Sequence, residues 1–356
     1  MTASEKLPEN SSSTLEGGKA ESDPRLPAQI AFRLDLDKTY LATRFESLRG
    51  LLKIPFEEAA DKQHLPGVPE LVQSLRRVAQ SQKLEPQVFF LSASPPQLGK
   101  VIREKLANDG VAVDGIVFKD QLRNLVRGHW RSLREQIGYK LVELLESRVT
   151  GDRPPTEVLF GDDWESDPVI YSLYADVLNG RLGATALNGY LGRLGVGRRQ
   201  RGRILDAVNT LAVPESGGEV VEKIFIRLEK RTPPSAFHVF GSRLVPTFNY
   251  LQTAAVLFEH NRMDLGGVAA VAAAMRADTG VGDDSLRTSL DDLARRGCFG
   301  LGSRSRVLRH LEKQGLSRRT PHVRQIRERI RATRERWRRI PHRPPDPVDY
   351  DKLLVD

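Results

Sequence analysis

Residues 31–39 read Ala31-Phe32-Arg33-Leu34-Asp35-Leu36-Asp37-Lys38-Thr39, so a short apolar run ends in two aspartates separated by a single residue. Side chains alternate along a strand, which sends Asp35 and Asp37 to the same side, and the turn beyond the strand exposes both. Two carboxylates this close repel each other, so their pairing makes sense mainly if a cation or a phosphoryl group binds between them. The pair therefore indicates phosphoryl-transfer chemistry.

Further short apolar runs are each ended by polar or glycine residues. With the first, the strand candidates are residues 29–34, 87–91, 115–118 and 157–160. Helical patterns separate them, at residues 69–78, 97–107 and 131–145. This alternation predicts an α/β fold with a doubly wound parallel sheet. In such sheets ligands bind beyond the carboxyl ends of the strands.

Polar side chains follow three of these strand candidates. Asp35 and Asp37 follow the first, Ser92-Ala93-Ser94-Pro95 follows the second, and Gly161-Asp162-Asp163 through Asp167 follows the last. Lys140, in the helix before the last strand, is the candidate for the cation that such a site needs to hold a phosphoryl oxygen, and Lys119, after the third strand, is its nearest competitor. Each group alone has an ordinary alternative, as an acidic loop, a turn, a helix cap or a solvated lysine. Their joint occurrence, each at its own strand end and in one order, favours a phosphatase fold.

In order and spacing, this set of residues resembles the four motifs of the haloacid dehalogenase (HAD) phosphatase superfamily. Within that superfamily, residues 65–71, 90–98 and 160–171 are similar to the catalytic domain of the actin-patch type phosphatidate phosphatases, and more distantly to the lipins. The resemblance covers residues 28–180. Lys38 departs from the family pattern, which more often has a second acidic residue at this position.

The resemblance implies an enzyme, a Mg²⁺-dependent phosphoric monoester hydrolase that acts through an aspartyl phosphate. Asp35 corresponds to the nucleophile and Asp37 to the acid and base, while Ser92 and Lys140 bind the phosphoryl oxygens. The Mg²⁺ is expected on Asp35, on the main-chain carbonyl of Asp37 and on Asp162. The leading substrate class is phosphatidate or another lipid phosphate.

The remaining residues of the motifs have supporting roles in this scheme. Asp163 and Asp167 are expected to orient a water on the metal or Lys140. Thr39 is expected to position the Asp37 loop, and the substrate-binding set is Lys38, Thr39 and Ser94.

Composition limits the classes of protein and of partner. The 356 residues carry a formal net charge of +9, which favours anionic partners. Cys298 is the only cysteine, so an intramolecular disulfide and a cysteine-built metal site are excluded. No apolar run reaches the roughly 18 residues of a transmembrane segment, and the N-terminus lacks the apolar core of a signal peptide. A cytoplasmic location is expected.

The chain divides into an α/β half and a helical, increasingly basic half. We expect a disordered tail over residues 1–26, a HAD-like phosphatase domain over 27–182, a mainly helical basic domain of unknown role over 183–345, and a C-terminal tail over 346–356. The gaps between the motifs leave little room for a large cap domain. The site is therefore predicted to be open, and able to admit a phosphate carried by a lipid, a nucleic acid or a protein.

Elements of the second half are predicted from local patterns. Residues 220–228 are expected to form a strand, and residues 248–258 and 265–275 to form helices, the latter Ala-rich and buried against a neighbour. Residues 272–297 resemble a helix-turn-helix faintly, and an ordinary helical hairpin is the stronger interpretation.

The basic end of the chain leaves two interpretations open. Fifteen Lys and Arg residues against three Glu lie between Arg304 and Arg343. This stretch is either an arm that binds nucleic acid or an anionic membrane surface, or, over residues 323–337, a helix that packs an apolar stripe on the body. The rival function is a nucleic-acid-binding or regulatory protein whose HAD domain is inactive or trims polynucleotide ends. The presence of every expected catalytic position favours an enzyme.

Overall fold

A computed structural model describes residues 28–42, 64–92, 96–118, 133–149, 156–164, 166–211, 219–230, 232–317 and 348–354. The strands are β1 (Gln29–Asp35), β2 (Glu85–Ser92), β3 (Gly115–Phe118), β4 (Thr156–Asp162), β5 (Val221–Arg227) and β6 (Leu244–Thr247). The helices of the first half are α2 (Val68–Ser81), α3 (Gly99–Asn108), α4 (Leu133–Val149) and α5 (Asp167–Leu178). Those that follow are α6 (Ala184–Arg193), α7 (Arg198–Thr210), α8 (Tyr250–Glu259), α9 (Leu265–Thr279), α10 (Asp283–Arg295) and α11 (Leu301–Lys313). Three short 3₁₀ helices are η3 (Pro96–Leu98), η4 (Pro234–Phe240) and η5 (Lys352–Leu354).

The six strands form one sheet in the order β3-β2-β1-β4-β5-β6, and every neighbouring pair is parallel. Both faces of a parallel sheet are covered, which is why β1 and β4 read as nearly continuous apolar runs. The predicted α/β fold with a parallel sheet is confirmed, and so is the mainly helical region that follows it.

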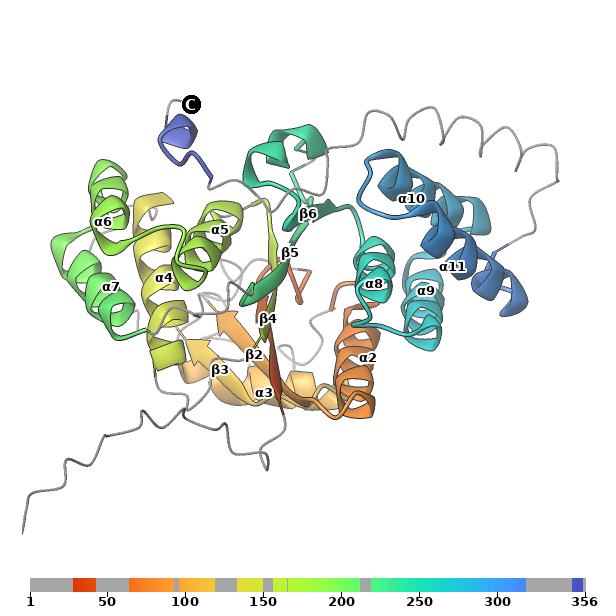
Figure 1. Ribbon diagram of the computed structural model, residues 1–356. Helices are drawn as coiled ribbons and strands as arrows, with labels where there is room; N and C mark the ends of the chain where they lie inside the picture. Colours follow the sequence, from red (N-terminus) through yellow and green to blue (C-terminus); the bar gives the residue numbers. More distant parts are fainter. Residues whose placement is uncertain are drawn as a thin grey trace, which may run out of the picture.

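Side chains alternate between two apolar cores, one on each face of the sheet. Phe32, Phe160 and Phe225 point to the core shared with α2, α3 and α8–α11. Leu159 and Ile224 point to the opposite core, shared with α4–α7. Figure 1 shows this arrangement, with the sheet between the two groups of helices. The central strands are thereby fixed on both faces, which positions the residues at their carboxyl ends.

The second half of the chain completes the sheet. The predicted strand at 220–228 forms β5, which pairs with β4, and β6 pairs with β5 on the outside. The sequence pattern missed β6, because it has only four residues and contains Pro246. Proline is tolerated at the outer edge of a sheet, where one side of the strand needs no hydrogen bonds. The domain boundary expected at residue 182 stays a prediction, and the sheet continues beyond it.

Helices α8 and α9 pack beside α2, and α10 and α11 pack on their outer side (Figure 1). Asn249 caps α8 by accepting a hydrogen bond from the Gln252 amide, and Asp264 caps α9 in the same way through Gly267. The Ala-rich helix predicted at 265–275 forms most of α9 and buries one face against α2 and α8. In α10 the leucines Leu286, Leu290 and Leu293 are buried in the same core, the packing of an ordinary helical hairpin.

Residues 348–354 lie in the segment predicted as a C-terminal tail, and they pack against the domain. Val348 and Tyr350 are buried among α5 and α6 residues, and the Tyr350 hydroxyl donates to Asp176 at 2.7 Å. The tail predicted at 1–26, the helix predicted at 323–337 and much of the region where a cap would be inserted lie outside the described residues. Among those described, none of the helices has both the length and the apolarity that crossing a bilayer requires.

Candidate active site

The carboxyl ends of three neighbouring strands bring predicted site residues together. Asp35 ends β1, Ser92 ends β2 and Asp162 ends β4, and both flanking strands pair with β1 in parallel register. These three side-chain positions are almost fully buried, with at most 2% exposure. The crevice predicted from the strand ends is therefore a compact cluster of oxygen-bearing side chains.

Lys140 reaches this cluster from α4. Its ammonium donates to Asp35 Oδ1 at 2.8 Å and to Asp167 Oδ1 at 2.6 Å. Lys140 is itself only 3% exposed. A buried ammonium between two carboxylates offsets part of the cost of removing all three charges from water. The cation expected near the strand ends thus contacts the residue expected to be the nucleophile.

Asp167 comes close to β4 because Gly161 has no side chain. A Cβ at Gly161 would lie 2.8 Å from Asp167 Cβ and 2.8 Å from Tyr171 Cε2. Asp167 also stands in the first turn of α5, where the helix dipole favours a negative charge. Burial, and after it the charge of Asp167, raises the pKa of Tyr171 well above its ordinary value, so this hydroxyl stays protonated and donates to the Phe160 carbonyl at 3.3 Å.

Three carboxylates of the cluster are close enough to share a cation. One oxygen each from Asp35, Asp162 and Asp167 lie within 4.8 Å of one another, and all three residues are buried. Carboxylate oxygens are the ligands that hard divalent cations prefer. The donor set fits a divalent metal. The predicted ligands are Asp35, Asp37 and Asp162. The structure shows that the carboxylate of Asp167 is also close enough to bind the same cation.

The loop after β1 carries Asp37 and is tightly folded. Lys38 has a left-handed backbone, with φ of 62°, and its amide donates to the Leu41 carbonyl at 2.9 Å. Asp37 and Thr39 are both buried. The Thr39 main-chain carbonyl accepts a hydrogen bond from the hydroxyl of Tyr250, at the start of α8. A residue from the second half of the chain therefore holds this loop.

The residues that the structure gathers, from Asp35 to Asp167, lie within one continuous stretch of the chain. Residues 34–187 match the family model of the phosphatidate phosphatase APP1 catalytic domain. The match confirms the resemblance seen in the sequence, over somewhat less than half of the chain. No curated protein and no solved structure matches the chain. The match to the family model, over residues 34–187 (the APP1-type segment below), supports a phosphatase that acts on a phosphorylated substrate and uses a divalent metal.

Two predicted residues of the APP1-type segment have partners other than those expected of them. Asp163 Oδ1 accepts hydrogen bonds from the amides of Glu229 at 2.6 Å and Lys230 at 3.0 Å, so this carboxylate anchors the loop after β5. The Lys38 ammonium lies 3.5 Å from Glu229 Oε1 and donates to the Ala42 carbonyl at 3.2 Å. Ser94 lies outside the described residues. The roles expected of these three residues stay predictions.

Sequence reasoning missed three residues beyond the APP1-type segment that contact the Asp37 loop. They are Arg227, at the end of β5, Glu229, two residues later, and Tyr250. The rule that polar residues after a strand end mark the site would have found Arg227 and Glu229, had the strand at 220–228 been placed beside β4. Tyr250 carries no such signal, because it follows an asparagine cap in an ordinary helix start.

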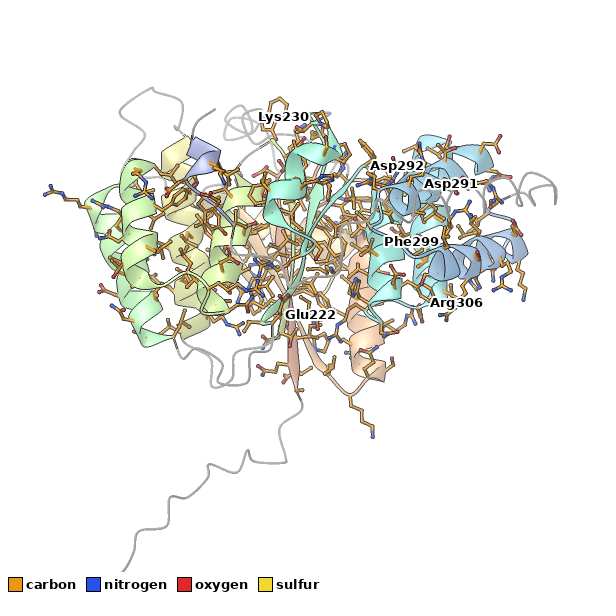
Figure 2. The ribbon with its side chains drawn as sticks, turned by 45° about the horizontal axis from the view of Figure 1, so that its top comes forward. Glu222, Lys230, Asp291, Asp292, Phe299 and Arg306 are labelled. Atoms are coloured by element: carbon orange, nitrogen blue, oxygen red, sulfur yellow. The ribbon has the colours of Figure 1, made fainter. Side chains whose placement is uncertain are left out.

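An aromatic and a cationic side chain stand at the rim of the same strand ends. Trp164, two residues after β4, is 39% exposed. The Lys230 ammonium lies 5.1 Å from the centre of its ring, an attractive cation–π geometry. Figure 2 shows Lys230 at the top of the molecule. The rim beside the buried acidic cluster is therefore partly apolar and positively charged.

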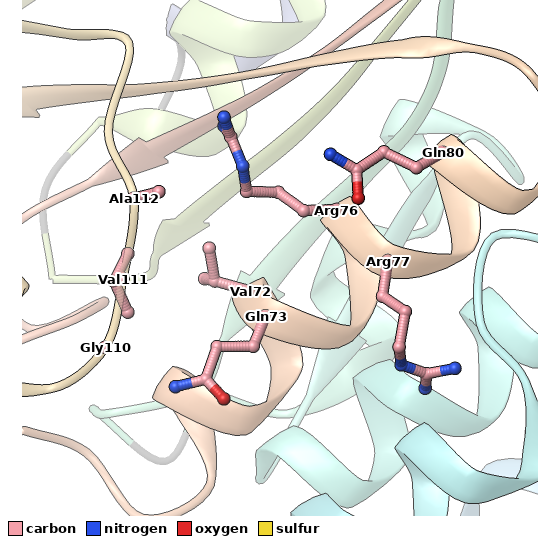
Figure 3. Close-up of a pocket in the computed structure, with 8 residues that line it drawn as sticks. All are labelled: Val72, Gln73, Arg76, Arg77, Gln80, Gly110, Val111 and Ala112. Atoms are coloured by element: carbon pink, nitrogen blue, oxygen red, sulfur yellow. The ribbon is translucent and has the colours of Figure 1, made fainter.

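A separate shallow pocket lies between α2 and residues 110–112, beside the amino end of β3 (Figure 3). Its two arginines already have acidic partners, since Arg76 pairs with Asp114 and Arg77 with Asp264. None of the predicted site residues lines it. The strand-end cluster, rather than this pocket, has the groups that phosphoryl transfer requires.

Proposed function

We propose that the protein is a Mg²⁺-dependent HAD-type phosphatase that hydrolyses a phosphomonoester through an aspartyl phosphate on Asp35. The observation that carries the proposal is the convergence of Asp35, Lys140, Asp162 and Asp167 at adjoining strand ends inside the APP1-type segment. A surface acidic loop would not need a buried lysine or three buried carboxylates within reach of one another.

In the first step, a carboxylate oxygen of Asp35 attacks phosphorus as the ester P–O bond breaks. Asp37 gives its proton to the departing alkoxide, which leaves as an alcohol. In the second step, Asp37 takes a proton from water as the water oxygen attacks phosphorus. The bond between phosphorus and Asp35 then breaks, which releases inorganic phosphate and restores both carboxyl groups.

Lys140 and Ser92 are proposed to bind the phosphoryl oxygens during both steps. The ammonium of Lys140 contacts Asp35 at 2.8 Å, so it is also proposed to orient the nucleophile. A Mg²⁺ held by Asp35, Asp162 and the Asp37 carbonyl, with Asp167 beside them, would neutralise phosphate charge that the carboxylates otherwise repel. Asp167 holds Lys140 in place from the other side.

The proposed substrate class is phosphatidate or another lipid phosphate. The support is the match to the phosphatidate phosphatase APP1 catalytic domain. The partly apolar and cationic rim at Trp164 and Lys230 suits a substrate that carries both acyl chains and a negative charge. A substrate class is a narrower proposal than the chemistry, and it needs its own test.

The test is phosphate release by the purified full-length protein from an aryl phosphate and from a panel of lipid, nucleotide and protein phosphates. We expect turnover with Mg²⁺, none with EDTA, and none in Asp35→Asn, with phosphatidate in mixed micelles the best substrate of the panel. Absence of turnover on every phosphomonoester would overturn the enzyme assignment. Preference for a nucleotide or protein phosphate would overturn the lipid assignment alone.

A further inference from the structure

Lys38 lies between Asp37, the expected acid and base, and Thr39, which is expected to bind substrate. Its backbone has a conformation that lysine rarely adopts. Its φ is 62°, in the left-handed region where a side chain with a Cβ is disfavoured. Such a conformation persists only when its surroundings hold it in place. The side-chain contacts of Lys38 therefore bear directly on the direction in which Asp37 points.

Two residues of one neighbouring segment hold both the main chain and the side chain of Lys38. Arg227 Nη1 donates to the Lys38 carbonyl at 3.1 Å, and Glu229 Oε1 lies 3.5 Å from the Lys38 ammonium. Glu229 Oε2 in turn accepts from Arg227 Nη1 at 2.5 Å. The three residues form a closed ring of contacts. Their side chains are 19–25% exposed, so water screens the charges only in part.

The segment that carries Arg227 and Glu229 is itself held in place. Arg227 ends β5, and the Leu228 amide donates to the Thr247 carbonyl of β6 at 2.8 Å. The Asp163 carboxylate binds the next two amides, those of Glu229 and Lys230. Strands β5 and β6 and the Asp163 carboxylate therefore hold Arg227 and Glu229 in place. Because these two residues are held, they are able to keep Lys38 in a strained conformation.

We propose that Arg227 and Glu229 are positioning residues, which hold Lys38 in its left-handed conformation and so direct Asp37 toward the leaving oxygen. The inference rests on the function proposed above, because it assigns an effect on turnover to Asp37. It also gives a physical reason for the lysine at a position where the APP1 family more often has an acid. The lysine is matched here by Glu229, which lies outside the APP1-type segment.

The test compares Glu229→Ala and Arg227→Met with the full-length wild-type protein, using an aryl phosphate and Mg²⁺. Both variants should lower kcat by on the order of tenfold to a hundredfold, the range for a misplaced catalytic group, while KM changes by less than about threefold. The matched control is Glu222→Ala, which removes another Glu–Arg pair, with Arg262, from the amino end of the same strand. Figure 2 shows Glu222 well apart from Lys230, the neighbour of Glu229. The control should retain wild-type kcat.

A second set of variants asks whether Glu229 acts through Lys38. Glycine adopts the left-handed conformation without the penalty that lysine meets, so Lys38→Gly needs no ring. Adding Glu229→Ala to Lys38→Gly should therefore change kcat by less than about twofold, the signature of two coupled positions. A full additive loss in the double variant would show that Glu229 acts elsewhere, and would overturn the inference.

Hydrogen exchange of the peptide covering residues 36–41 measures the loop without turnover. The amides of Lys38 and Leu41, which donate to the carbonyls of Leu41 and Leu36, should exchange faster in Glu229→Ala and Arg227→Met and remain unchanged in Glu222→Ala. Unchanged exchange, or wild-type kcat in an active enzyme, would overturn the positioning role. If the wild-type protein hydrolyses no phosphomonoester, the proposed function fails, while the exchange rates still decide whether the ring holds the loop.

Discussion

The ammonium of Lys140 lies 2.8 Å from the carboxylate of Asp35, and both side chains are buried. The same ammonium lies 2.6 Å from Asp167. One cation therefore lies between two of the three carboxylates that are able to share a metal. The same ion pairs therefore stabilise the folded protein and hold the residue that is proposed to attack phosphorus.

Lys140→Met should therefore affect both turnover and stability. Without the ammonium, Asp35 and Asp167 lose the cation that they share, and breaking a buried ion pair costs about 3–5 kcal/mol of unfolding free energy. We expect kcat to fall at least about a hundredfold, as on loss of a charge that stabilises the transition state. Urea unfolding and aryl phosphate turnover measure the two effects. Lys100→Met, at an exposed position of α3, should change neither, and wild-type turnover in Lys140→Met would refute the proposed role.

Gly161→Ala should separate Asp167 from the cluster. The added methyl group would lie 2.8 Å from Asp167 Cβ, so α5 or the aspartate has to move. A displacement of about 1 Å near the reacting groups can lower kcat on the order of a hundredfold. Gly202→Ala in α7, where a methyl group meets nothing within 4 Å, is the matched control. Equal turnover of the two variants would show that Asp167 needs no such close approach.

Divalent metal should stabilise the folded protein if it binds the three aspartates. A ligand that binds only the folded state adds about 2.7 kcal/mol at a concentration one hundred times its Kd. We therefore expect Mg²⁺ to raise the Tm relative to EDTA, in a concentration-dependent way. Asp162→Asn should abolish most of this increase, whereas Asp206→Asn in α7 should keep it. An identical increase in Asp162→Asn would place the metal elsewhere.

Glu157, in β4, makes buried polar contacts with side chains of β1, α4 and α5. Its Oε1 lies 3.0 Å from Arg33 Nη2 and 2.7 Å from Arg148 Nη1, and its Oε2 accepts from Tyr174 at 2.8 Å. Burial alone would raise the pKa of Glu157, but the two guanidinium groups outweigh burial and lower it below its ordinary value. The carboxylate is therefore more acidic in the folded protein than in the unfolded chain.

Glu157→Gln should destabilise the protein in a pH-dependent way. The wild-type ion pairs contribute fully above the unfolded pKa of glutamate, about 4.3, and their contribution is lost as the pH falls through the lower folded pKa. At pH 7 the variant removes the carboxylate charge that Arg33 and Arg148 share, and breaking a buried ion pair costs about 3–5 kcal/mol. Urea unfolding should show this difference at neutral pH and a smaller one as the pH falls below about 4. A difference independent of pH would contradict the assignment.

Close packing at the start of α9, beside α2, should make the free energy of unfolding sensitive to an added methyl group. A Cβ on Gly267 would clash with Met263 Sδ and would lie 2.8 Å from Ser74 Cβ in α2, whereas one on the adjacent Gly266 would meet only Asp264, with Oδ1 at 3.5 Å. Both substitutions add the same helix-favouring methyl group, so their difference isolates overpacking, about 1–3 kcal/mol. Urea unfolding should therefore find Gly267→Ala the less stable variant by that amount. Equal stabilities would show that Met263 and Ser74 move aside at little cost.

Local patterns were enough to predict most of the sheet and several of the residues that the structure brings together at its strand ends. Five of the six strands in the described sheet were predicted, because each is a short apolar run, and three of their ends carry Asp35, Ser92 and Asp162. β6 was missed because four residues with a central proline give no clear pattern. The position of Lys140 followed from its place in a helix and from the family resemblance, and its contacts with Asp35 and Asp167 required the structure.

The remaining site residues depend on contacts between distant parts of the chain. Lys38 and Glu229 are 191 residues apart, and nothing near either one predicts the other. Asp167 lies close to Asp35 and Asp162 because Gly161 leaves room for it, which residue type alone does not reveal. Lys38 was assigned to substrate binding from its motif. The left-handed backbone that the ring of Arg227 and Glu229 supports is a property of the folded chain.

The pairing of β4 with β5 has a practical consequence for any fragment of this protein. A fragment that ends at residue 187, where the APP1 match stops, would lack the whole of β5 and leave one side of β4 without hydrogen bonds. It would also uncover Phe160, whose ring stacks on Phe225 with centroids 5.4 Å apart. An open apolar strand of this kind recruits other chains and promotes aggregation. The smallest soluble unit with a complete sheet therefore extends at least through β6.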